Sequence, residues 1–152
     1  MRVGIIGCGN IANVHSWALN KLGVEEVVAF ADCVLDKAEN MAEKYTGKKA
    51  AVYDDYIKML NQEDLDVVHI CTPHYLHVPM AIETLKHNIS VFMEKPPAIS
   101  KEEFEELAKV VLESKGRIGF CFQNRYNETT KELDRIVQNK GLGNVIGGRG
   151  FV

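Results

Sequence analysis

The chain has 152 residues, 46% of them hydrophobic, with a formal net charge of −3 and a pI near 6.0. This length and apolar content suit a globular domain with a packed core, and the balance of charge provides no basic surface for nucleic acid or an anionic membrane. No apolar stretch reaches the roughly 20 residues of a membrane span, and the N-terminus has the pattern of a core strand with no room for a signal peptide, so we expect a cytoplasmic protein.

The first element of the chain is an apolar run that leads directly into Gly-Cys-Gly-Asn-Ile-Ala at residues 7–12. This is the Gly-x-Gly-x-x-Ala form of the dinucleotide-binding fingerprint. Gly7 permits a tight turn from strand to helix, and Gly9 lets a pyrophosphate approach the bare backbone. The unpaired N–H groups of the first helical turn, where Asn10 and Ile11 lie, supply a site for the anion.

A strand, helix, strand unit is predicted around this fingerprint. Apolar residues recur at helical spacing after it, and a glycine ends the helix: Ile11, Val14, Ala18, Leu22 and then Gly23. A second apolar run over residues 27–31 follows and ends at Asp32. Because a lone glycine pattern is weak evidence, this context is what makes it specific.

Asp32 is the predicted contact for the ribose of the adenosine. It follows Gly9 by 23 residues, close to the interval of about 20 at which an acid meets the ribose hydroxyls. A carboxylate there accepts hydrogen bonds from a diol and repels a 2′-phosphate; no Arg follows it, although Lys37 is near, so NAD is favoured over NADP. The alternative is that Asp32 caps the helix that begins near Leu35.

The rest of the chain continues to alternate helices and strands. Strands are predicted over residues 50–53, 66–71, 89–93 and 118–122, and the helices between them end at Gly47, Asn88 and Gly116. Their predicted inward faces are Ala38, Met41, Ala42 and Tyr45; Ile57 and Leu60; Val78, Ala81, Ile82 and Leu85; and Phe104, Leu107, Ala108 and Val111. A capping box, Ser100 with Glu103, opens the last of these helices.

This alternation predicts an α/β fold, a doubly wound parallel Rossmann-like sheet with helices on both faces. We expect residues 1–122 to form this dinucleotide-binding domain. Residues 123–152 differ: a helix over 128–139, with Leu133, Ile136 and Val137 buried, leads to a strand that starts at Asn144.

Polar residues gather after three of the predicted strands. They are Thr72, Pro73, His74 and His77; Glu94 and Lys95; and Arg125 with its neighbours. Because the carboxyl ends of parallel strands meet at one edge, all three loops should face the same crevice. Lys95 is a cation that could assist proton transfer or polarise an alcohol, the alternative being a surface ion pair with Glu94.

The histidines and cysteines give no metal site by spacing. His74 and His77 begin a helix and lack a third ligand, so a cofactor-facing or capping role is favoured, while His69 is expected inside the sheet and His15 on a helix surface. The four cysteines form no C-x-x-C pair and are expected to be reduced packing residues, with Cys8 open to alkylation in the phosphate loop.

Together these motifs resemble the glucose-fructose oxidoreductase, inositol dehydrogenase and rhizopine-catabolism (Gfo/Idh/MocA) oxidoreductases. The resemblance rests on the glycine-rich run, the terminal Asp32, the segments 71–77 and 94–96, and Asn124-Arg125-Tyr126, in the family's order and spacing. It covers the chain as the family's N-terminal half. The family's second, α+β domain, which carries the substrate pocket and the oligomer interface, is absent from this sequence, so we expect a part of a longer, homo-oligomeric protein.

The resemblance implies contacts between the cofactor and Cys71, Thr72, Pro73, His74, His77, Glu94, Lys95 and Arg125. It also implies that Lys95 takes part in catalysis and that the Lys95–Pro96 bond is cis. The predicted function is the cofactor half of an NAD-dependent oxidoreductase that moves hydride between nicotinamide and a secondary alcohol of a sugar or cyclic polyol. Two alternatives stay open: an NAD-dependent, redox-assisted glycosidase, and a non-catalytic dinucleotide-binding sensor.

Overall fold

A computed structural model describes residues 1–23, 26–140 and 143–149. They divide into two compact units, Met1–Cys121 and Phe122–Val152, which are described separately below. No helix among the described residues is long and apolar enough to cross a membrane.

The first unit is built on one parallel sheet of six strands in the order β3-β2-β1-β4-β5-β6. The strands are β1 (Arg2–Ile6), β2 (Glu26–Ala31), β3 (Ala51–Tyr53), β4 (Val67–Ile70), β5 (Ser90–Glu94) and β6 (Ile118–Cys121). Every neighbouring pair runs parallel. The predicted doubly wound Rossmann-like fold is therefore confirmed, with the switch in strand order between β1 and β4.

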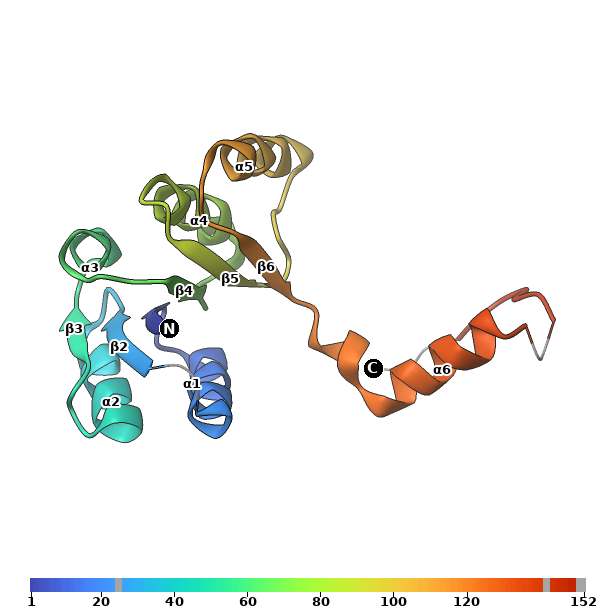
Figure 1. Ribbon diagram of the computed structural model, residues 1–152, viewed down its shortest axis with the longest axis horizontal. Helices are drawn as coiled ribbons and strands as arrows, with labels where there is room; N and C mark the ends of the chain where they lie inside the picture. The colour runs from blue at the N-terminus through green and yellow to red at the C-terminus, as the bar shows by residue number, and fades with distance from the viewer. Residues whose placement is uncertain (24–25, 141–142, 150–152) are drawn as a thin grey trace. The chain divides into compact units, whose positions relative to one another are not determined.

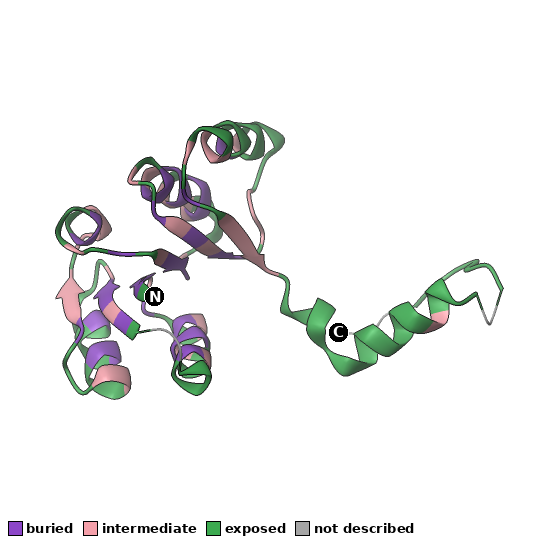
Figure 2. Cartoon of the chain, in the orientation of Figure 1, coloured by how far each residue is buried: buried purple, intermediate pink, exposed green. Residues whose placement is uncertain are grey.

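Helices cover both faces of this sheet (Figure 1). On one face lie α1 (Asn10–Leu22) and α2 (Leu35–Thr46); on the other lie α3 (Tyr56–Gln62), α4 (His77–Lys86) and α5 (Lys101–Glu113). Two buried clusters separate along these faces, one around Phe30 and Met41 under α1 and α2, and one around Ile70 and Leu85 under α3 to α5. Figure 2 shows this burial along the strands and the inner sides of the helices.

Most of the predicted turn and cap residues are confirmed, but α5 ends at Glu113 with Ser114 as its cap, before the predicted Gly116. Gly23, Gly47 and Asn88 end their helices in the left-handed region, with φ of 65°, 60° and 59°. The Ser100 hydroxyl accepts the Glu103 N–H at 3.1 Å, as in a capping box. The returning Glu103 carboxylate binds the N–H of Ile99 rather than that of Ser100.

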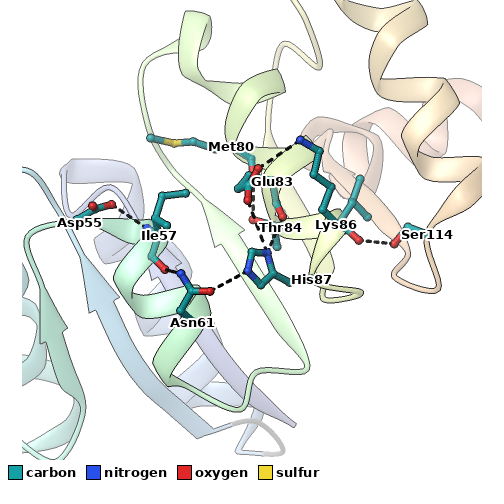
Figure 3. A network of polar contacts seen from close by, with 10 residues as sticks. Asp55, Ile57, Asn61, Met80, Glu83, Thr84, Lys86, His87 and Ser114 are labelled. Carbon is teal, nitrogen blue, oxygen red and sulfur yellow. Dashed lines mark hydrogen bonds and ion pairs between the residues drawn. The ribbon is translucent and has the colours of Figure 1, made fainter.

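A polar network ties α3 to α4 and α4 to the end of α5 (Figure 3). His87, just after α4, contacts the Glu83 carbonyl at 3.0 Å and the Asn61 side chain of α3 at 3.3 Å. The Ser114 hydroxyl donates to the Leu85 carbonyl at 2.7 Å. These bonds satisfy backbone groups at a helix end and stabilise that face of the sheet.

Two predicted helix faces are wrong. In α1 the buried residues are Ala12, His15, Ser16 and Leu19, whereas Val14 and Leu22 are exposed, because the small Ala12 and Ser16 let the helix approach the sheet closely. In α5 only Leu107 is buried, since this helix covers the outer strands of the sheet and turns Phe104 and Ala108 toward solvent.

The second unit contains the short helix η2 (Gln123–Tyr126) and α6 (Glu128–Gln138). The helix forms as predicted, and Asn127 caps it by accepting the Thr129 N–H at 3.0 Å. The predicted burial of Leu133 and Val137 is wrong, since both side chains are exposed, whereas Ile136 is half-buried. The predicted strand from Asn144 does not form over the described residues 143–149, where no strand pairs with it, and residues 150–152 lie outside the described part.

Candidate functional site

A groove of about 580 Å³ opens in the first unit at the carboxyl ends of β1, β2 and β4. It lies at the switch in strand order, where open α/β sheets bind their ligands. Predicted site residues that line it are Gly7, Gly9, Asp32, Cys71, Thr72 and Pro73. Residues that the sequence analysis did not assign to it also contribute, among them Asp54, Asp55, Tyr56, Leu76 and Met80.

The two glycines of the loop after β1, Gly7 and Gly9, have different surroundings. Gly7 has φ of +86°, and a Cβ there would lie 2.8 Å from the Cys71 carbonyl oxygen. Gly9 is the N-cap of α1 with φ of −87°, and nothing lies within 4 Å of a Cβ built on it. Gly7 is thus required by the packing of the loop, whereas the space at Gly9 stays open for a ligand.

The loop ends at a bare helix N-terminus. α1 begins at Asn10, carries no acidic residue in its first turn and has no side-chain cap. Its N-cap residue, Gly9, lines the groove, so the positive end of the helix dipole lies beside it. This arrangement can bind a phosphate, as the fingerprint predicted.

Asp32 is half-buried and joins two loops of the groove. Its Oδ2 accepts the N–H of Cys8 at 2.8 Å, and its Oδ1 accepts the N–H of Val34 at 2.9 Å. Val34 is the N-cap residue of α2, so the carboxylate does not bond to the first turn of that helix. A fixed carboxylate in the groove, with Lys37 also on the lining, is suited to accept hydrogen bonds from hydroxyl groups.

The loop after β4 forms another wall. Thr72 and Pro73 line the groove, and the Thr72 hydroxyl contacts the Met80 sulfur at 3.5 Å. His74 is exposed in the short helix η1 (His74–Leu76), and its ring meets that of His77 edge-on at a centroid distance of 5.6 Å.

His77 is fully buried behind this wall. Its Nδ1 faces the Pro96 carbonyl at 2.9 Å, and its Nε2 faces the Thr72 carbonyl at 3.0 Å. The imidazole therefore joins the loop after β4 to the turn after β5. Two carbonyl oxygens can only accept, so the doubly protonated ring satisfies both and the neutral ring satisfies one.

The turn after β5 carries Glu94 and Lys95. Glu94 is buried, whereas Lys95 is exposed, and the Lys95–Pro96 peptide bond is cis, as the resemblance implied. The backbone N–H of Lys95 donates to Oε2 of Glu94 at 3.2 Å. The alternative, a surface ion pair between the two side chains, is not present, because the Glu94 carboxylate is buried and contacts His15.

Glu94 belongs to a buried cluster that the sequence analysis did not find. Its Oε1 lies 3.1 Å from Nε2 of His15, and His15 Nδ1 lies 2.9 Å from Nδ1 of His69. The surface position predicted for His15 is therefore wrong, and the interior position predicted for His69 is right. No periodicity could reveal the cluster, because its members come from α1, β4 and β5.

The charges of this cluster follow from its contacts. Burial lowers the pKa of His69 to about 3. For Glu94, burial acts to raise the pKa, but hydrogen bonds from His15, Cys121 and the Lys95 backbone outweigh it, and the pKa is lowered. Glu94 is thus ionised and His69 neutral at pH 7.

Two of the cysteines that lie at the groove, Cys8 and Cys71, are buried. Burial and the Asp32 charge raise the pKa of Cys8 to about 12, and burial raises the pKa of Cys71 further still. The predicted alkylation of Cys8 in the phosphate loop is therefore disfavoured. Its thiol instead packs under the loop and contacts the Ala31 carbonyl.

Arg125 lies in η2 of the second unit and is exposed. Its backbone N–H donates to the Phe122 carbonyl at 3.1 Å. The groove belongs to the first unit, and the predicted contact of Arg125 with the cofactor stays a prediction.

The chain is similar to proteins of known activity. A family described as an oxidoreductase family with an NAD-binding Rossmann fold (Gfo/Idh/MocA) matches residues 1–122. D-glucoside 3-dehydrogenase of Escherichia coli is 36% identical over 149 residues, which are 95% of this chain and 41% of that protein. Inositol 2-dehydrogenase of Salmonella paratyphi B is 30% identical over 145 residues, 94% of this chain and 43% of that protein.

A solved structure is similar to this chain in both fold and sequence. The WlbA dehydrogenase of Bordetella pertussis, in complex with NADH and UDP-GlcNAcA, matches with a TM-score of 0.85 and 31% identity, over 93% of this chain and 43% of that one. The chain thus spans less than half the length of these proteins.

Proposed function

Since the chain belongs to the Gfo/Idh/MocA oxidoreductase family and carries its NAD-binding Rossmann domain, we propose that the groove at the carboxyl edge binds NAD in preference to NADP. The observation that carries this proposal is the pairing of an open Gly9 and uncapped α1 with the fixed carboxylate of Asp32 in one groove. The first binds an anionic pyrophosphate and the second a ribose diol.

The residues present fit the pyrophosphate and the adenosine ribose of such a cofactor. The N-terminal turn of α1, with Asn10 and Ile11, receives the pyrophosphate, and Asp32 receives the adenosine ribose. The nicotinamide half belongs over the other half of the sheet, at the ends of β4 to β6, where Thr72, Pro73, His74, Glu94 and Lys95 follow their strands. When bound, NAD supplies the acceptor for a hydride.

We propose that the whole protein is a dehydrogenase that acts on a secondary alcohol of a sugar or cyclic polyol. The support is the similarity to proteins named as dehydrogenases of a glucoside and of inositol. In this proposal Nζ of Lys95 touches the substrate alcohol and, as a neutral amine, accepts the hydroxyl proton. Lys95 is exposed, which leaves that atom accessible to a substrate.

The proposal includes a two-part organisation of the chain. Residues 1–122 would bind the cofactor, and residues 123–152 would lead toward a substrate-binding domain of the longer protein, the part through which it forms homo-oligomers. Arg125, at the start of the second part, would contact the cofactor.

A parallel titration tests the cofactor proposal. The purified chain is titrated with NADH and with NADPH, and the nicotinamide fluorescence is followed in each. We expect saturable binding with at least about tenfold preference for NADH, because a carboxylate at Asp32 disfavours a 2′-phosphate. Absence of binding to either dinucleotide, in a chain shown to be folded by circular dichroism, would contradict the proposal. A preference for NADPH would overturn the role of Asp32.

A further inference from the structure

The buried cluster of His15, His69 and Glu94 lies outside the groove but next to Lys95. Each of the three side chains is at most 9% exposed, and together they form a continuous chain of contacts from β4 through α1 to β5. Phe92 packs against both imidazoles, with centroid distances of 5.8 Å to His15 and 5.0 Å to His69. Such a cluster in an apolar interior is costly unless its protons are well placed.

The proton positions follow from the contacts. Glu94 is ionised and can only accept, so His15 donates to it through Nε2–H. The Nδ1–Nδ1 contact of 2.9 Å needs one N–H and one lone pair. A neutral His15 with a bare Nδ1 that accepts from His69 satisfies both contacts with one proton on each imidazole ring. In this state the cluster carries one net negative charge, on Glu94.

A metal ion at this place would have to displace the same proton. His15, Glu94 and Cys121 offer donor atoms within 4.8 Å of one another, which resembles a metal-ligand set. A metal would need the Nε2 lone pair, whereas the 3.1 Å contact with the carboxylate is a hydrogen bond that uses the Nε2 proton. The Cys121 thiol, which also bonds to Glu94, completes the satisfaction of the carboxylate.

The position of Glu94 in the sheet gives this charge a use. Asp32, at the end of β2, marks the adenosine side of the switch point, so the nicotinamide ring of a bound dinucleotide belongs on the side of β4 to β6, where Glu94 ends β5. The ring is positively charged in NAD⁺ and neutral in NADH. A buried carboxylate there is screened by solvent less than the exposed Lys95 ammonium.

We propose that Glu94, held ionised by His15 and His69, is the group that favours the oxidised over the reduced cofactor. His15 and His69 are positioning residues: they fix the carboxylate and keep its charge without adding one. This inference rests on the proposed function, because it assumes that the groove binds NAD.

The test compares the two affinities rather than the activity. Dissociation constants for NAD⁺, by calorimetry, and for NADH, by fluorescence, are measured for the chain and for Glu94→Gln, which keeps the shape and removes the charge. A unit charge about 10 Å away, at an effective dielectric constant of about 20, changes an affinity by about tenfold. We therefore expect NAD⁺ affinity to fall about tenfold and NADH affinity to change less than about twofold.

Two further variants separate charge from structure. His15→Gln keeps the carboxylate and supplies an amide N–H donor to it in place of the imidazole, so the ratio of the NAD⁺ and NADH affinities should stay close to that of the unmodified chain. Glu83→Gln removes a carboxylate of α4 that pairs with Lys86 and His87, away from the groove, and should change neither affinity (Figure 3). An equal fall for NAD⁺ and NADH in Glu94→Gln, or no fall, overturns the inference while leaving NAD binding intact. Loss of binding in the unmodified chain instead overturns the proposed function, and the inference with it.

A spectroscopic measurement covers the case in which Glu94→Gln does not fold. The nitrogen chemical shifts of the labelled histidines at pH 7 should show His15 neutral, with its proton on Nε2, and His69 neutral. An imidazolium at His15, or a stoichiometric metal in elemental analysis of the purified chain, would overturn the inference.

Discussion

The backbone N–H of Cys8 donates a 2.8 Å hydrogen bond to Oδ2 of Asp32, so the glycine-rich loop after β1 is held by the same carboxylate that the groove offers to a ribose. The two parts of the predicted fingerprint, 24 residues apart, are therefore one structural unit. Asp32 prepares the loop for a pyrophosphate while its remaining lone pairs accept from hydroxyl groups.

Replacing Asp32 should weaken the binding of NADH more than the binding of NADPH. Asp32→Ala removes the acceptors for the diol and the bond to Cys8, each about 1.5–3 kcal/mol for a charged group, and it also removes the repulsion of a 2′-phosphate. We expect at least about a tenfold loss in NADH affinity and a smaller loss for NADPH, measured by fluorescence titration. Asp36→Asn, an exposed acid in the first turn of α2, is the control. An unchanged affinity for both dinucleotides would remove Asp32 from the site.

Substitution of the two loop glycines should affect different properties: stability for Gly7 and cofactor binding for Gly9. Gly7→Ala should lower the free energy of unfolding by about 2 kcal/mol or more, because its φ is +86° and the new Cβ meets Cys71 and Thr72 at 2.8 Å. Gly9→Ala has open space around its Cβ and should cost only about 1 kcal/mol or less, the usual cost of alanine at an N-cap, yet abolish NADH binding by occupying the path of the pyrophosphate. Urea denaturation and fluorescence titration check the pair; NADH binding by Gly9→Ala with normal affinity would count against the assigned phosphate site.

Lys95 should matter for turnover and little for cofactor affinity. In a protein of its relatives' full length, Lys95→Ala should lower kcat by about 10²–10⁴-fold, the usual contribution of a proton-transferring side chain, and leave the Kd for NADH within about twofold. Steady-state kinetics with a sugar or polyol substrate measures this. Lys101→Ala, which removes an exposed lysine paired with Glu105, is the matched control. If kcat and cofactor affinity fall to the same extent, Lys95 is a binding residue.

The stability of the fold should fall with acid through His69. Its pKa is lowered to about 3 from an ordinary 6.5, so between these values the unfolded chain binds a proton that the folded chain does not. The free energy of unfolding therefore decreases as the pH falls through this window, by at most about 1.4 kcal/mol per pH unit. Glu94, whose pKa is lowered below 4.5, adds its own loss only at lower pH.

Urea denaturation between pH 7.5 and 5 checks this dependence. His69→Gln should show a shallower decrease than the unmodified chain, because the unfolded state no longer gains that proton. His87→Gln changes a partly exposed histidine and should keep the original slope. Parallel slopes for all three proteins would show that His69 does not carry the effect.

His77 should be a structural cross-link between two walls of the site. His77→Ala leaves the Thr72 and Pro96 carbonyls unpaired and opens a cavity, which should cost about 2–4 kcal/mol. Loosening of the loop that carries Thr72 should also weaken NADH binding. His87→Ala, whose ring bonds to the Glu83 carbonyl at a helix end, should cost less than about 1 kcal/mol. Equal losses in thermal denaturation would mean that His77 has no special role.

The sequence by itself determined the architecture and the groove. Alternating apolar runs, glycine stops and the Gly7 to Asp32 spacing depend on local geometry, since a parallel strand is buried on both faces and a helix must end where a left-handed residue stands. For the same reason Thr72, Pro73 and Lys95 could be placed at the carboxyl edge before the sheet was seen.

Only the tertiary structure decided what lies beneath that edge. His15, His69 and Glu94 are separated by up to 79 residues in sequence, and their contact depends on the approach of α1 to the sheet. A polar residue on a helix predicts a solvent-facing position until a partner is found for it, and hydrogen bonding inside the protein then reverses that expectation. The predicted burial of the apolar residues on α5 and α6 was wrong for the opposite reason. An apolar stripe on a helix is buried only where another element covers it.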